Sequence, residues 1–204
     1  ILNIEFIKEF PDSINLTNYF WMLTEAPNGY LLYGLIQRPD YFHDGFIRYV
    51  DKTGETIWFK YLTTSNFDNG VLDLEMTSDT TFVAGMVNGT SASGAASSLW
   101  RYHIDGTLLD FWQSDSEPEM GYLREIIPAS DGGLITYGLY VAYIVPNSPG
   151  LPGTKMVQST LTKFDTAFQI QLVRHFGPIK SLNSNIILRE FVSTPDGNSV
   201  GTGE

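Results

Sequence analysis

The chain of 204 residues is 43% apolar and 17% charged, a composition that excludes an intrinsically disordered chain and a coiled coil. Its 23 acidic and 12 basic side chains give a net charge of −11, so we expect no nucleic-acid partner, because such a partner needs a cationic surface. The sequence has no cysteine, which excludes disulfides and thiolate metal sites. Glycines and prolines interrupt the uncharged stretch 132–154, so we expect no transmembrane segment.

The first predicted element is a strand at residues 4–8, whose sequence is similar to that of residues 56–60. After it, one pattern recurs four times: an apolar run, a small polar turn, a second apolar run and a glycine. The four copies cover residues 22–34, 74–85, 126–138 and 191–203. Each of the first three copies is followed by two further strands, separated by a turn that begins at Asp51, Asp105 or Asp165. The strands before these turns are residues 47–51, 100–105 and 161–165, and those after them are residues 56–61, 108–112 and 168–173.

One unit is therefore four short strands, A to D, and helical periodicity is poor throughout. Four-stranded antiparallel units at this period predict an all-β fold, a β-propeller, with a β-sandwich as the alternative. The predicted blades are residues 14–62, 70–113 and 121–176, with half a blade at 185–204 and a D strand of a neighbouring or closing blade at 1–10. Because the last unit lacks strands C and D, we expect a partial ring of a longer propeller.

The periodicity of strand A in the second unit predicts which side chains share a face. Alternation places Leu72, Leu74 and Met76 on one face of the strand and Val71, Asp73 and Glu75 on the other.

The unit Ser-Asp-Gly-Gly-Leu-Ile-Thr-Tyr-Gly at 130–138, with the basic–aromatic–Asp turns and the Ile-Trp-Phe strand at 57–59, resembles the repeats of secreted β-propeller proteins of Bacteroidetes. The resemblance covers about residues 4–204. It implies export by the type IX secretion route or a lipoprotein anchor, and so an extracellular, cell-surface or outer-membrane location in a Gram-negative bacterium. The motifs are structural and carry no catalytic residue. The chain departs from them at 79–81, which lacks the turn glycines, and at Asp165, whose turn lacks the glycine that Gly54 and Gly106 supply.

Three Asp-Ser/Thr-apolar tripeptides are similar to the O-glycan acceptors of that phylum. They make Ser13, Thr80 and Thr166 candidate O-glycosylation sites, and ordinary turn residues are the alternative interpretation.

The strand order of a blade predicts which end of the protein binds a partner. The A–B and C–D turns lie at one end and are short, whereas the B–C and D–A loops lie at the other end and are long and dissimilar, as binding loops are. The side chains that we expect to contact a protein or a surface glycan are Asp40, Tyr41, Phe42, His43, Tyr143, Ile144, Val145 and Leu151. The alternative is that these side chains pack back onto their own blades.

The chemical motifs are weak. The three histidines have no metal-ligand spacing, phosphate loops are missing, and we expect no metal site, no cofactor and no catalytic residue. Arg124 and Arg189 recur on strand A, where an arginine-rich sialidase-like centre would lie, and pairing with Glu125 or Glu190 is the structural alternative. We therefore expect a non-catalytic interaction module of an exported bacterial protein. A glycan-processing hydrolase and a structural subunit of an outer-membrane secretion or motility assembly are the alternatives.

Overall fold

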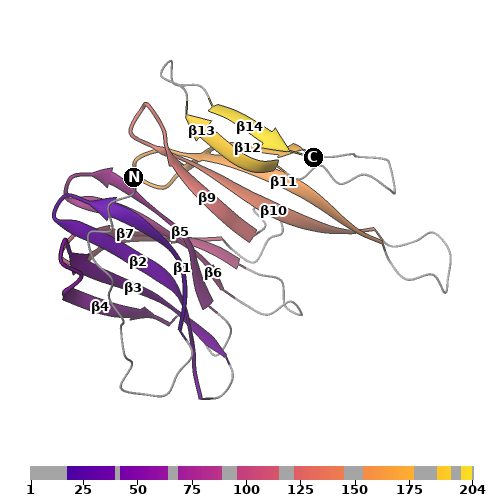
Figure 1. The fold of residues 1–204 in the computed structure, drawn as a ribbon. Helices are drawn as coiled ribbons and strands as arrows, with labels where there is room; N and C mark the ends of the chain where they lie inside the picture. Colours follow the sequence, from indigo (N-terminus) through magenta and orange to yellow (C-terminus); the bar gives the residue numbers. More distant parts are fainter. Residues whose placement is uncertain are drawn as a thin grey trace, which may run out of the picture.

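The computed structural model describes residues 18–39, 42–63, 69–88, 96–114, 122–144, 154–176, 188–193 and 199–203. Over these residues the protein is all-β, with three four-stranded antiparallel sheets and one two-stranded sheet (Figure 1). The predicted all-β class and the four-stranded antiparallel unit are thereby confirmed. Within the described ranges, no helix is long and apolar enough to cross a bilayer.

The strands follow one another in each sheet in chain order. Sheet 1 contains β1 (Asn18–Ala26), β2 (Gly29–Gln37), β3 (His43–Asp51) and β4 (Thr56–Leu62). Sheet 2 contains β5 (Asn69–Ser78), β6 (Thr81–Asn88), β7 (Ala96–His103) and β8 (Leu108–Gln113). Sheet 3 contains β9 (Tyr122–Pro128), β10 (Leu134–Ile144), β11 (Thr154–Phe164) and β12 (Ile170–Phe176), and sheet 4 contains β13 (Leu188–Ser193) and β14 (Ser199–Gly203).

The third and fourth strands of the first three sheets form hairpins on one template. In the first hairpin, the amide of Asp51 donates to the carbonyl of Glu55 at 2.9 Å, and the amide of Gly54 donates to the carbonyl of Asp51 at 3.0 Å. The same two hydrogen bonds recur from His103 and Gly106, and from Asp165 and Phe168. Aligned on these bonds, residues 45–62, 97–114 and 159–176 match without a gap.

This alignment corrects two expectations from the sequence. The position of Asp51 and Asp165 is occupied in sheet 2 by His103, and Asp105 lies two residues later. The third hairpin turns at Phe168, which takes a left-handed φ of 57° where Gly54 and Gly106 have 83° and 88°. Phe168 therefore belongs to the turn, and the strand predicted at 168–173 begins instead at Ile170.

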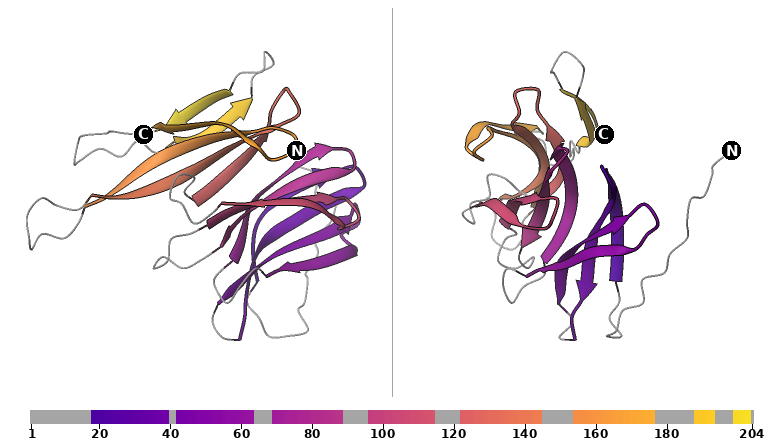
Figure 2. Two further views of the ribbon diagram at one scale, coloured as in Figure 1. Left: turned by 180° about the vertical axis from the view of Figure 1, so that it is seen from behind. Right: turned by 90° about the vertical axis from the view of Figure 1, so that its left-hand side faces the viewer.

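The sheets pack face against face, with the first strand of each sheet lying on the sheet before it. β5 contacts β1, β2 and β3 of sheet 1, β9 contacts β5, β6 and β7 of sheet 2, and β13 contacts β9 of sheet 3. Figures 1 and 2 show the resulting succession of twisted sheets. One apolar cluster fills the space between sheets 1 and 2 and includes Leu31, Ile47 and Leu74, all 0% exposed. A second, which includes Leu99, Leu123 and Phe164, lies between sheets 2 and 3.

At both of these interfaces, a side chain of one sheet reaches the C–D turn of the next. From β4, Trp58 Nε1 donates to the carbonyl of Ile104 at 2.9 Å, and Lys60 Nζ donates to the carbonyl of Gly106 at 2.5 Å. From β7, the Arg101 guanidinium donates to the carbonyl of Thr166 at 2.7 Å and lies 4.1 Å above the ring of Phe168. These bonds fix the turn of each sheet against its predecessor.

Candidate functional site

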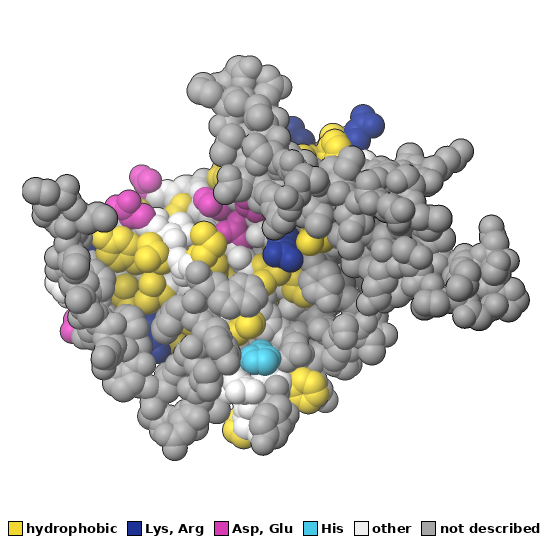
Figure 3. Space-filling view, turned by 45° about the vertical axis from the view of Figure 1, so that its right-hand side comes forward, with side chains coloured by type: hydrophobic (Ala, Val, Ile, Leu, Met, Phe, Trp, Pro, Cys, Tyr) yellow, Lys and Arg dark blue, Asp and Glu magenta, His cyan; other side chains and the backbone are white. Residues whose placement is uncertain are grey.

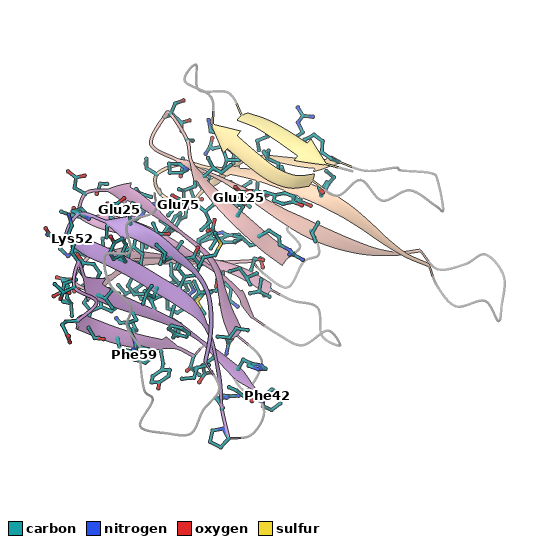
Figure 4. All side chains as sticks on the ribbon, in the orientation of Figure 1. Glu25, Phe42, Lys52, Phe59, Glu75 and Glu125 are labelled. Carbon is teal, nitrogen blue, oxygen red and sulfur yellow. The ribbon has the colours of Figure 1, made fainter. Side chains whose placement is uncertain are left out.

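The first strands of the three large sheets each carry a glutamate. Glu25 lies on β1, Glu75 on β5 and Glu125 on β9, at a constant spacing of 50 residues in the sequence. Figure 4 shows the three side chains following one another across the adjacent strands. Glu25 is exposed, and Glu75 and Glu125 are half-buried. The packing of β5 on β1 and of β9 on β5 brings them into this row.

Asp73, two residues before Glu75, joins three sheets. Its side chain is on the middle sheet and the residue is 7% exposed. Oδ1 accepts a hydrogen bond of 3.1 Å from the hydroxyl of Tyr33 in sheet 1, and Oδ2 accepts one of 2.5 Å from the amide of Ile126 in sheet 3. A buried carboxylate needs such donors, because burial without them costs several kcal/mol. Both carboxylate oxygens of Asp73 are therefore engaged in holding the sheets together.

The expected alternation on β5 is wrong at this point. The ladder between β5 and β6 shifts register between Val71 and Asp73, and Val71, Asp73 and Leu74 are all buried. Sheet 2 is covered on both faces at its first strand, by sheet 1 and by sheet 3. Alternation separates a buried face from a solvated face only where one face meets water.

Burial dominates the electrostatics of this region. It raises the pKa of Glu75 to about 7, with the charges of Asp73 and Glu125 adding to the effect. Burial also raises the pKa of Asp73, because it outweighs the hydrogen bonds from Ile126, Leu74 and Tyr33 that favour the charged form. The pKa of Tyr33 is raised by burial and by the neighbouring Asp73. Glu75 therefore changes charge near neutral pH.

An open groove of about 470 Å³ lies beside the row of glutamates, between the β1–β2 turn and the end of β5. It is lined by Glu25, Ala26, Pro27, Met76, Thr77, Ser78 and Asp79. In Figure 3, acidic side chains gather on the upper part of the visible face, next to apolar side chains. A groove with two carboxylates and a methionine suits a cationic group carried on an apolar stem.

The chemistry open to this region is limited. Within the part of the chain that the structure describes, no group of three or more His, Asp or Glu side chains is placed to hold a metal ion. Glu75 and Glu125 form a pair of neighbouring carboxyls, one of which holds its proton to near neutral pH. Such a pair is the minimum that acid–base hydrolysis of a glycoside requires. Arg124 is exposed on β9, and Arg189 lies on β13, whose side chains are outside the description.

Phe42, one of the predicted binding residues of the first loop, lies at the opposite end of sheet 1 from Glu25 (Figure 4). Phe42 is half-buried, and the Arg38 guanidinium lies 5.4 Å from its ring centre. Arg38 also forms an ion pair of 3.6 Å with Asp44, and its amide donates to the carbonyl of Phe42 at 2.7 Å. His43 is half-buried and begins β3 opposite Gln37. Arg38 thus anchors one side of this loop.

Of the second predicted group, Tyr143 and Ile144 belong to sheet 3, and sheet 2 lies between sheets 1 and 3 in the packing order. Tyr143 and Ile144 are not in a loop: they end β10, where they pair with Lys155 and Thr154 of β11. Asp40, Tyr41, Val145 and Leu151 lie outside the described residues.

Of the three candidate O-glycosylation sites, two lie within the described residues. Thr80 and Thr166 are exposed, at the β5–β6 turn and at the β11–β12 turn. The backbone carbonyl of each residue accepts a hydrogen bond. That of Thr80 accepts from the amide of Ile104, and that of Thr166 accepts from the guanidinium of Arg101. Ser13 lies outside the described residues.

Sequence reasoning did not single out Glu25 and Glu75, or the pairing of Tyr33 with Asp73. The constant spacing of 50 residues between the three glutamates was a signal that could have found the row. No periodicity could have found the pairing, because Tyr33 and Asp73 meet only through the packing of one sheet on the next.

The fold and this site define an all-β protein of successive four-stranded sheets whose first strands bring carboxylates together. No protein-family model matches the sequence, and no curated protein matches it at a significant level.

Proposed function

We propose that the sheets are blades of a β-propeller, forming part of a longer ring, and that the protein is a non-catalytic interaction module of an exported, cell-surface or envelope-associated bacterial protein. Its partner is a protein or a glycan, bound through the B–C and D–A loops. The resemblance to secreted propeller repeats supports the location. The face-to-face packing of three antiparallel sheets in chain order supports the propeller.

The observation that carries the binding role is the contrast between the two ends of the sheets. The A–B and C–D turns are short, as at 27–28 between β1 and β2 and at 52–55 between β3 and β4. The B–C and D–A connections at the other end differ from sheet to sheet, with residues 145–153 between β10 and β11 and residues 177–187 between β12 and β13. A constant scaffold with variable connections at one end is the usual arrangement of a binding surface.

The hydrogen bonds of the buried Asp73 side chain argue for a structural rather than a catalytic role. Both oxygens of Asp73 accept hydrogen bonds from neighbouring sheets. A glycan-processing hydrolase is the second candidate, favoured by the pKa of about 7 of Glu75 beside Glu125. The third, a structural subunit of an outer-membrane assembly, would show itself by stable co-purification.

Loop replacement tests the binding role. Residues 145–153 are exchanged for a short Gly-Asn turn, and binding to a glycan array and to envelope proteins is measured. The matched control replaces 79–80, in the turn at the other end, by Asn-Gly. We expect at least tenfold weaker binding of a partner for the first variant only, with unchanged thermal unfolding. Equal binding by both variants would exclude this loop, and turnover of chromogenic glycosides that is lost in Glu75→Gln or Glu125→Gln would establish the hydrolase.

A further inference from the structure

The face of sheet 3 that points away from sheet 2 carries the positions that the next sheet covers in sheets 1 and 2. In sheet 3 part of this face is exposed to solvent. At three matched positions, sheet 1 buries Leu31, Ile47 and Leu62 at 0%, 0% and 4% exposure under sheet 2. Sheet 2 buries the equivalents Val83, Leu99 and Ser114 at 0%, 0% and 9%. In sheet 3 the equivalents are Ile135 and Leu161, both half-buried, and Phe176, which is 39% exposed.

The open part of this face is confined to one side. Near β9, on which β13 lies, Ile127 and Tyr137 are buried at 8% and 3% exposure. Toward β11 and β12 the cover ends, and Leu172 is 40% exposed. Apolar side chains at an open sheet face are the signature of a surface that is covered by a partner.

Sheet 4, which packs on this face, has two described strands fewer than the other sheets. Sheets 1, 2 and 3 each continue from their second strand into a third and a fourth, whereas the described part of sheet 4 consists of β13 and β14. No described strand pairs with β14 on the side away from β13. Two strands added to β14 in the same order would lie over β11 and β12, as the turn between β7 and β8 lies against β4 through the hydrogen bonds from Trp58 and Lys60.

We propose that this face, bounded by β14, Leu161, Leu172 and Phe176, is the docking site for one further β-hairpin of the C–D type, which pairs with β14 and completes sheet 4. This inference rests on the proposed propeller. Burial at matched positions indicates the hairpin. A second copy of residues 18–203 is a poor occupant, because its three C–D hairpins are already built into four-stranded sheets.

The template defines the chemistry of the hairpin. Its backbone adds to the edge of β14, as in recognition by strand addition. Its third strand carries an apolar or aromatic residue at the position of Tyr102 and Phe164, which are 2% and 0% exposed against the preceding sheet. Its turn presents carbonyls to Arg174, which occupies the position from which Lys60 reaches the carbonyl of Gly106.

A peptide of residues 96–114, which is the C–D hairpin of sheet 2, is the probe for this site. It is titrated into the full chain, and binding is followed by calorimetry and by hydrogen exchange of β12 and β14. We expect saturable binding with at least tenfold slower exchange in β14. A peptide with Tyr102→Asp should bind at least tenfold more weakly.

Two variants of the chain locate the site. Leu172→Asp should weaken peptide binding at least tenfold, whereas Leu109→Asp, at an exposed apolar position (52%) on the outer strand β8, should leave it unchanged. Absence of binding, or equal binding by both variants, would overturn the proposal. So would a dimer of the chain that is dissociated by Leu172→Asp, because a second copy would then be the occupant. None of these results depends on residues 145–153, so a failure here is distinct from a failure of the binding loops.

Discussion

The hydroxyl of Tyr33 on β2 donates a hydrogen bond of 3.1 Å to Oδ1 of Asp73 on β5, and this bond joins sheet 1 to sheet 2. The other oxygen of Asp73 accepts from the amide of Ile126 on β9, so one carboxylate connects three sheets. We call these two hydrogen bonds of Asp73, from Tyr33 and from Ile126, the clasp. Its strength decides how firmly the first strands of the sheets are held together.

Removing the donor of this clasp should destabilise the fold. Tyr33→Phe keeps the buried ring but leaves one oxygen of a buried carboxylate without its partner, which costs about 1–3 kcal/mol. Urea unfolding followed by tryptophan fluorescence measures the loss. Tyr61→Phe, at an exposed position (46%), is the matched control and should change the free energy of unfolding by less than about 0.5 kcal/mol. Equal effects of the two changes would refute the clasp.

The titration of Glu75 should make the protein less stable as the pH rises. Its folded pKa of about 7 exceeds the ordinary 4.5, so its contribution to stability is complete below pH 4.5 and is lost as the pH rises through 7. Glu75→Gln should therefore gain stability relative to wild type between pH 5 and pH 8, by about 1 kcal/mol, since solvent screens a partly exposed group.

The measurement is the free energy of unfolding of both proteins at pH 5 and pH 8. Glu25→Gln, at an exposed position, is the control for removal of a carboxyl from the same row and should not reproduce this gain. Asp51, Asp105 and Asp131 have a lowered pKa from their hydrogen bonds, so they act in the opposite direction and only in acid. A stability difference between Glu75→Gln and wild type that is the same at both pH values would contradict the prediction.

Replacing Phe168 by glycine should destabilise the protein, although glycine suits the left-handed φ of 57° better. Relief of backbone strain returns about 1–2 kcal/mol. Loss of a buried phenyl ring, 2% exposed and in contact with Arg101, costs about 3–5 kcal/mol. We expect a net loss of about 2 kcal/mol by thermal unfolding. Gln169→Gly, exposed in the same turn, is the control, and a more stable Phe168→Gly would show that strain dominates.

Gly85 on β6 lies where sheets 2 and 3 approach each other closely. A Cβ there would overlap Leu123 and lie 2.9 Å from Cδ1 of Ile126. Gly85→Ala should therefore cost about 1–3 kcal/mol through overpacking. Gly45→Ala, whose Cβ would meet Val71 at 3.2 Å, should cost less. Chemical unfolding of both variants gives the order, and a reversed order would show that the interface between sheets 2 and 3 can relax.

The recurring strands and turns were predictable because they depend on local chemistry. Turn glycines permit positive φ, as at Gly54, Gly106 and Gly132, and apolar runs between turns form strands. The alignment of the hairpins was predicted only in part. Asp51 and Asp105 look equivalent in sequence, but the turn hydrogen bonds equate Asp51 with His103, because what the turn requires is a backbone geometry that a left-handed residue three positions later completes.

The sequence by itself determined that this protein is built from repeated antiparallel four-stranded units, since strand periodicity and turn preference are properties of short segments. Only the tertiary structure decided which side chains meet between units. The burial of Asp73, its bonds to Tyr33 and Ile126 and the open face at Leu172 and Phe176 all depend on how one sheet lies on the next. Tyr33 and Asp73 are 40 residues apart in the chain, and Asp73 and Ile126 are 53 apart, so it is the packing of sheets and not a local preference that brings them together.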